Sequence, residues 1–210
     1  YIQTHLSENT AEIAAVRERF PDSSSYTDVY REAGLLGPRS IFGHAIHLSD
    51  REIDLLATSG SRVAHCPTAN LFLNSGLCPL LALRQAGIPV GLGSDVAAGP
   101  ELNLWQVMRS AIETQAVRRM QDESIPILSP ADALHLATMG AATALGKDHL
   151  IGSLDPGKEA DLLLLDLNRV LPLRGRFSPP ADANSIATAL VYRGHPAATV
   201  ATFTRGNRTS

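Results

Sequence analysis

Cysteine and long apolar runs are both scarce in this chain. Its 210 residues include two cysteines, Cys66 and Cys78, which excludes the disulfide framework of small secreted domains and fits a reducing, cytoplasmic location. No apolar stretch approaches the roughly 20 residues that a membrane-spanning helix needs, so we expect no membrane partner. No leader sequence is visible, but Tyr1 already lies in strand-like sequence, and we expect the chain to begin partway through a longer protein.

An excess of positive charge is also lacking. The chain has 18 Lys and Arg against 21 Asp and Glu, a net charge of −3, which excludes the basic surface that nucleic acid binding requires. Hydrophobic residues make up 44% and charged residues 19%, proportions typical of a folded globular chain. The length suits one domain or one and a half, because domains commonly have about 100–200 residues.

Predicted strands alternate with predicted helices up to Asp95. Apolar, β-branched segments predict strands at Tyr1–His5, Ser40–His44, Arg62–His65 and Ile88–Gly93. Helical periodicity and end signals predict helices ending at Phe20, over Tyr26–Ala33, from Ser49 to Gly60 and over Leu77–Ala86, then near Glu101–Arg119 and Ser129–Leu145. This alternation is typical of parallel βα units in an α/β fold, either an open sheet or a barrel.

Polar side chains at the strand ends favour the barrel. His5, His44, His65 and Asp95 each stand at the C-terminal end of a predicted strand, where barrel enzymes place their chemistry. A complete (β/α)8 barrel has eight βα units in about 250 residues, whereas four such units are visible here. We therefore expect residues 1–148 to form the C-terminal half of a TIM-like barrel.

In residues 149–210 the alternation of predicted strands and helices stops. Strands are predicted at Ala160–Leu167, Ala187–Arg193 and Ala198–Thr204, with a loop over Pro172–Asn184. We expect this β-rich segment to be part of a small β-sandwich domain, separate from the barrel.

Each candidate site residue also has a plainer explanation when taken alone. His5 could bind zinc through an imidazole nitrogen or be a surface histidine. His44 could be a site residue or a buried, hydrogen-bonded core histidine. Glu8, three residues after His5, could transfer protons or cap a helix. Asp95 could ligate a metal or cap a turn. Their joint placement at one rim favours a single site.

The His65-Cys66 pair is not expected to hold one ion, because adjacent strand side chains point to opposite faces. We expect a structural role for Cys66, since no local feature lowers the pKa of its thiol. His47, just beyond His44, is expected to be an ordinary polar loop residue.

A series of motifs extends over nearly the whole chain. In order they are Gln3-Thr4-His5-Leu6-Ser7-Glu8-Asn9, Tyr26-Thr27-Asp28-Val29-Tyr30, Gly43-His44, His65-Cys66-Pro67-Thr68-Ala69-Asn70-Leu71 and Gly91-Leu92-Gly93-Ser94-Asp95-Val96-Ala97. Together they resemble the motifs of guanine deaminases, within the amidohydrolase superfamily. The run from Ile151 to Asp161 resembles the superfamily's return into its small β-sandwich.

The resemblance implies an enzyme that deaminates guanine hydrolytically to xanthine and ammonia, with one zinc ion per complete subunit. It implies His5 and Asp95 as zinc ligands and Glu8 as the shuttle that carries a proton to the substrate ring. His44 would hydrogen-bond the attacking hydroxide or the developing charge, and Asp95 would also act as general base.

Two elements of the family pattern are absent from the sequence given, the His-x-His pair of the first strand and the Arg-Phe pair that reads guanine. We therefore expect the activity to belong to the complete protein and not to these residues alone. Two alternatives stay open, namely an aminohydrolase of the same superfamily acting on another purine, a pterin or a triazine, and a non-catalytic fragment acting as a subunit. A homodimer is compatible with the sequence.

Overall fold

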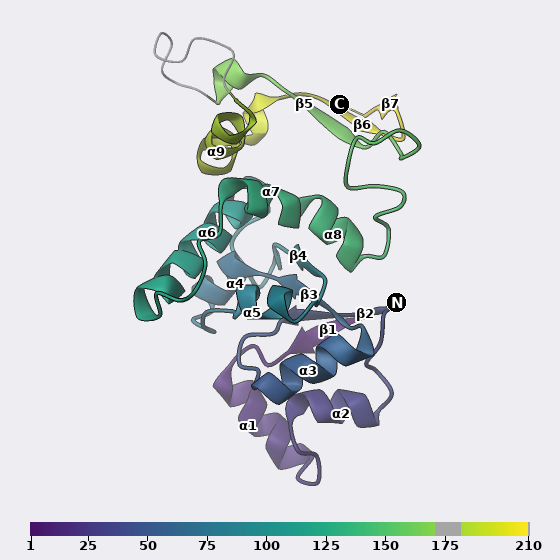
Figure 1. Cartoon of the computed structure of the whole chain (residues 1–210), viewed down its shortest axis with the longest axis vertical. Helices are drawn as coiled ribbons and strands as arrows, with labels where there is room; N and C mark the ends of the chain where they lie inside the picture. Colours follow the sequence, from purple (N-terminus) through teal and green to yellow (C-terminus); the bar gives the residue numbers. More distant parts are fainter. Residues whose placement is uncertain (171–181, 210) are drawn as a thin grey trace.

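A parallel four-stranded sheet forms the centre of the larger part of the molecule (Figure 1). The computed structural model describes residues 1–170 and 182–209. The strands are β1 (Ile2–Leu6), β2 (Ser40–His44), β3 (Arg62–His65) and β4 (Val90–Leu92). They pair in sequence order and all run parallel, so their C-terminal ends meet at one edge. The predicted α/β class and parallel sheet are confirmed.

Helices connect the strands and cover the sheet from two sides. The connections contain α1 (Thr10–Arg19), α2 (Tyr26–Glu32), α3 (Asp50–Ser59), α4 (Pro67–Phe72) and α5 (Leu80–Gln85). After β4 follow α6 (Leu104–Gln121), α7 (Pro130–Ala137) and α8 (Met139–Ala144). In Figure 1, α1 to α3 lie below the sheet and α6 to α8 above it. None of the helices in the described ranges has the length and apolarity needed to cross a membrane.

Capping side chains explain where the helices begin. At α3 the Ser49 side chain accepts from the Glu52 amide, while the Glu52 carboxylate accepts from the Ser49 amide, which forms a capping box. The helix ends at Gly60, whose φ of 72° is left-handed and favours glycine. Ser129 and Asp132 form the same kind of box at α7. The start of α3 and its end agree with the sequence prediction.

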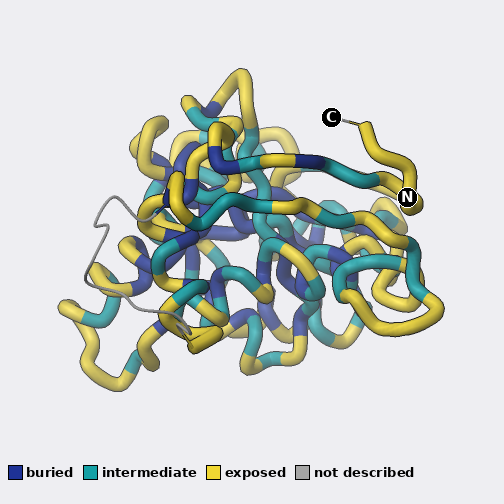
Figure 2. Tube along the Cα trace, turned by 90° about the horizontal axis from the view of Figure 1, so that it is seen from above, coloured by how far each residue is buried: buried dark blue, intermediate teal, exposed yellow. Residues whose placement is uncertain are grey.

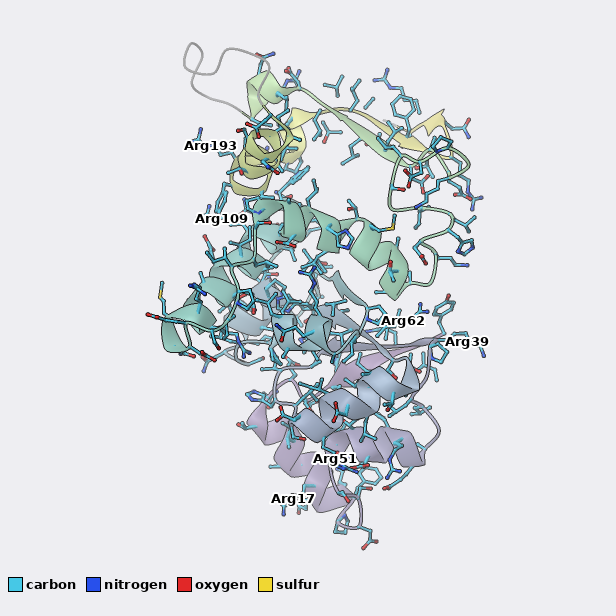
Figure 3. The ribbon with its side chains drawn as sticks, in the orientation of Figure 1. Arg17, Arg39, Arg51, Arg62, Arg109 and Arg193 are labelled. Atoms are coloured by element: carbon cyan, nitrogen blue, oxygen red, sulfur yellow. The ribbon has the colours of Figure 1, made fainter. Side chains whose placement is uncertain are left out.

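One predicted helix is divided in two. The pattern over Ser129–Leu145 predicted a single helix, but the chain breaks at Thr138 (φ −119°, ψ −94°) between α7 and α8. Glycine at position 140 lets α8 approach β4, since a Cβ added there would lie 2.9 Å from the carbonyl oxygen of Val90. Arg62, labelled in Figure 3, donates to the Ala144 carbonyl at 3.1 Å and so ties the end of α8 to the start of β3.

The C-terminal part contains a second, antiparallel sheet of β5 (Leu162–Leu165), β6 (Thr199–Thr204) and β7 (Asn207–Arg208). The strands predicted over Ala160–Leu167 and Ala198–Thr204 are confirmed by β5 and β6.

The strand predicted at Ala187–Arg193 is wrong, because these residues lie in helix α9 (Ala183–Arg193). Buried Ala187, Leu190 and Val191 recur at helical spacing and face α6 and α7. This packing outweighs the strand preference of the segment's branched and aromatic residues. Of the predicted loop Pro172–Asn184, residues 172–181 lie outside the described residues, and Ala183 and Asn184 begin α9.

The main core lies between the parallel sheet and its helices. Leu6, Phe42 and Val63 come from neighbouring strands and are fully buried, and Figure 2 shows buried segments running through the middle of the fold. A smaller cluster of Val170, Leu190 and Ala198 packs with Trp105 of α6. Through it the C-terminal part is joined to the larger one.

Candidate active site

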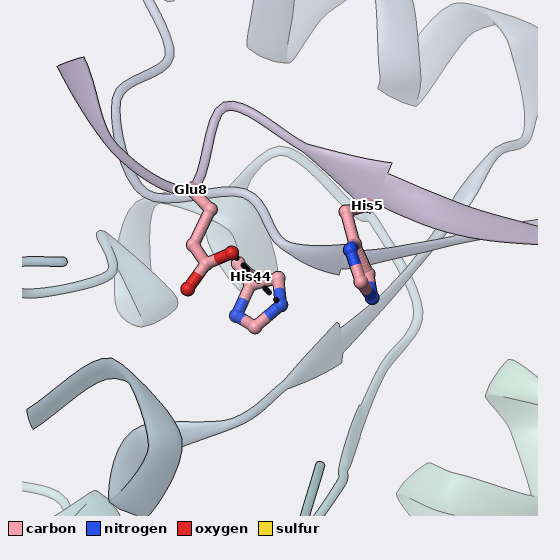
Figure 4. Close-up of side chains that lie close together, drawn as sticks. All are labelled: His5, Glu8 and His44. Atoms are coloured by element: carbon pink, nitrogen blue, oxygen red, sulfur yellow. Dashed lines mark ion pairs between the residues drawn. The ribbon is translucent and has the colours of Figure 1, made fainter. Parts of the chain in front are cut away.

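The C-terminal edge of the parallel sheet brings three of the predicted residues together (Figure 4). His5 lies near the end of β1, His44 ends β2, and Glu8 follows β1 in the loop toward α1. In the sheet register His5 is opposite Gly43, and a Cβ added there would lie 3.3 Å from the His5 ring. Glycine at position 43 therefore leaves room for the imidazole.

The side chains form a close polar cluster. His5, Glu8 and His44 each offer a ligand atom within 4.8 Å of the others. The rings of His5 and His44 meet edge to face with centroids 5.0 Å apart. The Nε2 atom of His44 lies 3.7 Å from a Glu8 carboxylate oxygen and 3.8 Å from one of Asp95. Asp95, which follows β4, therefore meets this cluster at His44.

Backbone strain coincides with this cluster. Ser7, His44 and Asp95 have φ values of 49°, 70° and 51°, which side-chain-bearing residues rarely adopt. Such conformations cost energy and persist where the surrounding structure enforces them, commonly at functional sites. Here Ser7 directly follows β1, His44 ends β2, and Asp95 comes three positions after the end of β4, so all three lie where the cluster is formed.

Asn70 fixes the orientation of His44. His44 is buried, and its Nδ1 lies 2.8 Å from the side-chain oxygen of Asn70. Because an amide oxygen only accepts hydrogen bonds, Nδ1 is the protonated nitrogen. Nε2 then faces the Glu8 and Asp95 carboxylates, and a proton on Nε2 or a cation among the three groups would favour this arrangement electrostatically.

His65 does not join the cluster, although it ends β3. It is fully buried, and neither ring nitrogen has a hydrogen-bond partner among the residues described. Burial, with a smaller effect of nearby His44, lowers the pKa of His65 to about 3, so the ring is neutral.

Burial and, secondarily, the Asp95 carboxylate raise the pKa of the Cys66 thiol to about 12. The thiol is therefore not a nucleophile at neutral pH, which fits the structural role expected for it.

Ser75 is a site residue that the sequence did not reveal. Its Oγ donates to Glu8 Oε1 at 2.8 Å, across 67 positions of sequence. In the sequence Ser75 stands between Asn74 and Gly76, a composition typical of a turn. No neighbouring residue indicates that its hydroxyl contacts Glu8. His47, expected to be an ordinary loop residue, donates from Nε2 to the carbonyl of Ser75 at 2.8 Å.

Comparison with known proteins agrees with this geometry. A family model described as the amidohydrolase family matches residues 1–209. The chain belongs to the amidohydrolase family. The α/β fold with its parallel sheet is thus an amidohydrolase fold, and the site lies at the edge where the amidohydrolase strands end.

Guanine deaminases are among the proteins to which this amidohydrolase chain is similar. Guanine deaminase of Escherichia coli (strain K12) is 40% identical over 166 residues, which are 79% of this chain and 36% of that protein. A solved structure of the E. coli enzyme covers 100% of this chain and 47% of its own, with a TM-score of 0.92 and 34% identity. Guanine deaminase from C. acetobutylicum, with guanine bound in its active site, covers 98% and 48% with a TM-score of 0.88 and 30% identity. The chain spans about a third of the length of the curated relatives it matches.

The residues at this amidohydrolase rim fit a divalent cation. Two carboxylates converge on one imidazole nitrogen, and in the described ranges neither of them pairs with a lysine or arginine. Imidazole and carboxylate are also the ligands that zinc accepts. A solved atrazine chlorohydrolase from Arthrobacter aurescens, complexed with zinc, covers 98% of this chain and 43% of its own, with a TM-score of 0.82 and 25% identity.

Proposed function

We propose that the complete protein hydrolyses guanine to xanthine and ammonia with the help of one zinc ion. The observation that carries this proposal is the convergence of His5, Glu8, His44 and Asp95 at one sheet edge. The similarity to guanine deaminases, one of them with bound guanine, supports the choice of substrate.

Each site residue of this chain would have its own role in the reaction. His5 and Asp95 would hold the zinc, which makes water nucleophilic near neutral pH. Asp95 would accept a proton from the attacking water, and Glu8 would deliver a proton to the ring nitrogen next to the amino-bearing carbon. His44, held by Asn70, would hydrogen-bond the charge that develops during attack.

The proposal extends to the architecture. Four parallel strands with polar C-terminal ends suit the second half of a (β/α)8 barrel in residues 1–148, completed by segments outside this sequence. The antiparallel strands β5 to β7 suit part of a small β-sandwich in residues 149–210. The remaining zinc ligands and the groups that read guanine would then come from the other half of the barrel.

The test is an assay of the full-length protein with a panel of heterocycles. We expect xanthine and ammonia from guanine, about one zinc per chain, and a loss of turnover of at least about a hundredfold in Glu8→Gln, because general acid–base groups contribute that much. Activity on a pterin, triazine or other purine, and none on guanine, would overturn the choice of substrate. A metal-free protein with retained activity would overturn the zinc mechanism.

A further inference from the structure

The Glu8 carboxylate receives a hydrogen bond from a distant part of the chain. Ser75 Oγ donates to Glu8 Oε1 at 2.8 Å, while the other carboxylate oxygen lies 3.7 Å from His44 Nε2. The two oxygens therefore have different surroundings. One is anchored by the serine hydroxyl, and the other faces the centre of the cluster.

Ser75 is itself held on both sides by its backbone. Its amide donates to the Asn70 carbonyl at 2.8 Å, and its carbonyl accepts from His47 Nε2 at 2.8 Å. Gly76, with φ 131°, lets the chain pass close by, since a Cβ there would lie 3.1 Å from Ile46 and 3.3 Å from the His47 ring. Ser75 is 5% exposed. The direction of its hydroxyl is thus fixed by the fold and not by solvent.

The same segment orients the neighbouring imidazole. Asn70 of α4 accepts from His44 Nδ1, and Ser75 lies five residues later in the chain. This connection between β3 and α5 thus positions one side chain that follows β1 and another that ends β2. Glu8 and His44 face each other in Figure 4 in the arrangement that these two contacts maintain.

We infer that Ser75 is a positioning residue that holds the Glu8 carboxylate with one oxygen turned toward the reacting atoms. The inference rests on the proposed function, in which Glu8 transfers the proton. Without the hydroxyl, Glu8 Oε1 loses its donor and the side chain gains access to other rotamers. A smaller fraction of molecules then has the carboxylate in place, so the loss falls on kcat more than on KM.

The test compares Ser75→Ala, Ser75→Thr and wild type in the full-length protein. We expect Ser75→Ala to lower kcat for guanine about tenfold to a hundredfold, as is typical when a group supporting a site residue is lost. Ser75→Thr keeps a hydroxyl and should recover most of the activity. Ser129→Ala is the matched control, because it removes a 2.6 Å serine–carboxylate bond at the start of α7 and should leave kcat unchanged. Thermal melting of each variant reports its folding.

A double-mutant cycle separates positioning from a general structural effect. If Ser75 acts through Glu8, Ser75→Ala should cause no further loss in a Glu8→Gln background. An unchanged kcat in Ser75→Ala, or an equal loss in both backgrounds, overturns the inference and leaves the proposed function standing. If the wild-type protein does not deaminate guanine, the proposed function fails, and crystal structures decide the inference. A Glu8 carboxylate displaced in Ser75→Ala supports it, and one that keeps its position refutes it.

Discussion

At the scale of single residues, Asp28 shows how one buried carboxylate joins two helices. It lies in α2 and accepts two hydrogen bonds from Arg51 of α3, at 2.6 and 2.9 Å, and others from Arg31 and Ser25. The Arg51 guanidinium, which outweighs the effect of burial, holds the pKa of this carboxyl well below its ordinary value. The stabilisation that the ionised Asp28 carboxylate gives is therefore fully present above the unfolded pKa of about 3.9. It is lost as the pH falls through the lower pKa of the folded state.

Asp28→Asn keeps the shape of the side chain but removes its charge. We expect the free energy of unfolding at pH 7 to fall by about 1–2 kcal/mol, since charge-assisted hydrogen bonds are lost and Arg51 is half-exposed. The difference from wild type should shrink below about pH 4. Urea denaturation at pH 7 and pH 3 measures both effects, with exposed Asp54→Asn on α3 as control. A difference that is the same at both pH values would contradict this account.

At the scale of elements, a chain of hydroxyl groups ties β1 to the helices that follow it. Tyr30 Oη donates to the His5 carbonyl at 3.0 Å and lies 3.2 Å from Tyr26 Oη. Tyr26 donates to one oxygen of Glu12, and the other oxygen accepts from the Glu8 amide at 2.8 Å. The chain of contacts thus starts at His5 and returns to Glu8, which fixes the loop between them.

Tyr30→Phe tests the contribution of this chain. The phenyl ring retains its stacking on Phe42, with ring centroids 5.4 Å apart in the wild type, so only the hydroxyl is lost. We expect about 1–2 kcal/mol of destabilisation, because the hydroxyl contacts both the His5 carbonyl and Tyr26 Oη and one hydrogen bond usually contributes about 1 kcal/mol. We also expect weaker zinc binding in the full-length protein. Thermal melting and metal titration measure the two effects. Tyr192→Phe, on the exposed side of α9, is the control and should change neither quantity. An unchanged zinc affinity in Tyr30→Phe would show that these hydroxyl contacts do not support the metal site.

The elements also show what the sequence could predict. Strands such as Ser40–His44 and the helix after Ser49 follow from local pattern and capping, and both match the structure. The polar strand ends could be predicted because parallel strands place their ends together. The helix α9 could not, because its burial against α6 and α7 decides between helix and strand. Ser75 and Glu8 could not be paired either, since 67 positions separate them.

At the scale of the whole molecule, the converging carboxylates predict how metal removal affects stability. Without a cation, Glu8 and Asp95 face the same imidazole nitrogen with like charges, which disfavours the folded site. We expect chelation of the full-length protein to abolish activity and to lower its melting temperature. Adding zinc back to a free concentration of about a hundred times its Kd should raise the free energy of unfolding by about 2.7 kcal/mol. Calorimetry before and after chelation measures the change, and an unaltered melting temperature would contradict the metal site.

The joint between the two sheets has a practical consequence for following the protein in solution. Trp105 is the single tryptophan of the chain, and it packs with the small cluster beneath α9. Gly194 approaches so closely that a Cβ there would lie 2.6 Å from its indole ring. Within residues 1–210, indole emission therefore comes from the joint alone. When the C-terminal segment separates from α6, the indole becomes more hydrated and its emission shifts to longer wavelengths, so undocking can be observed without any added label.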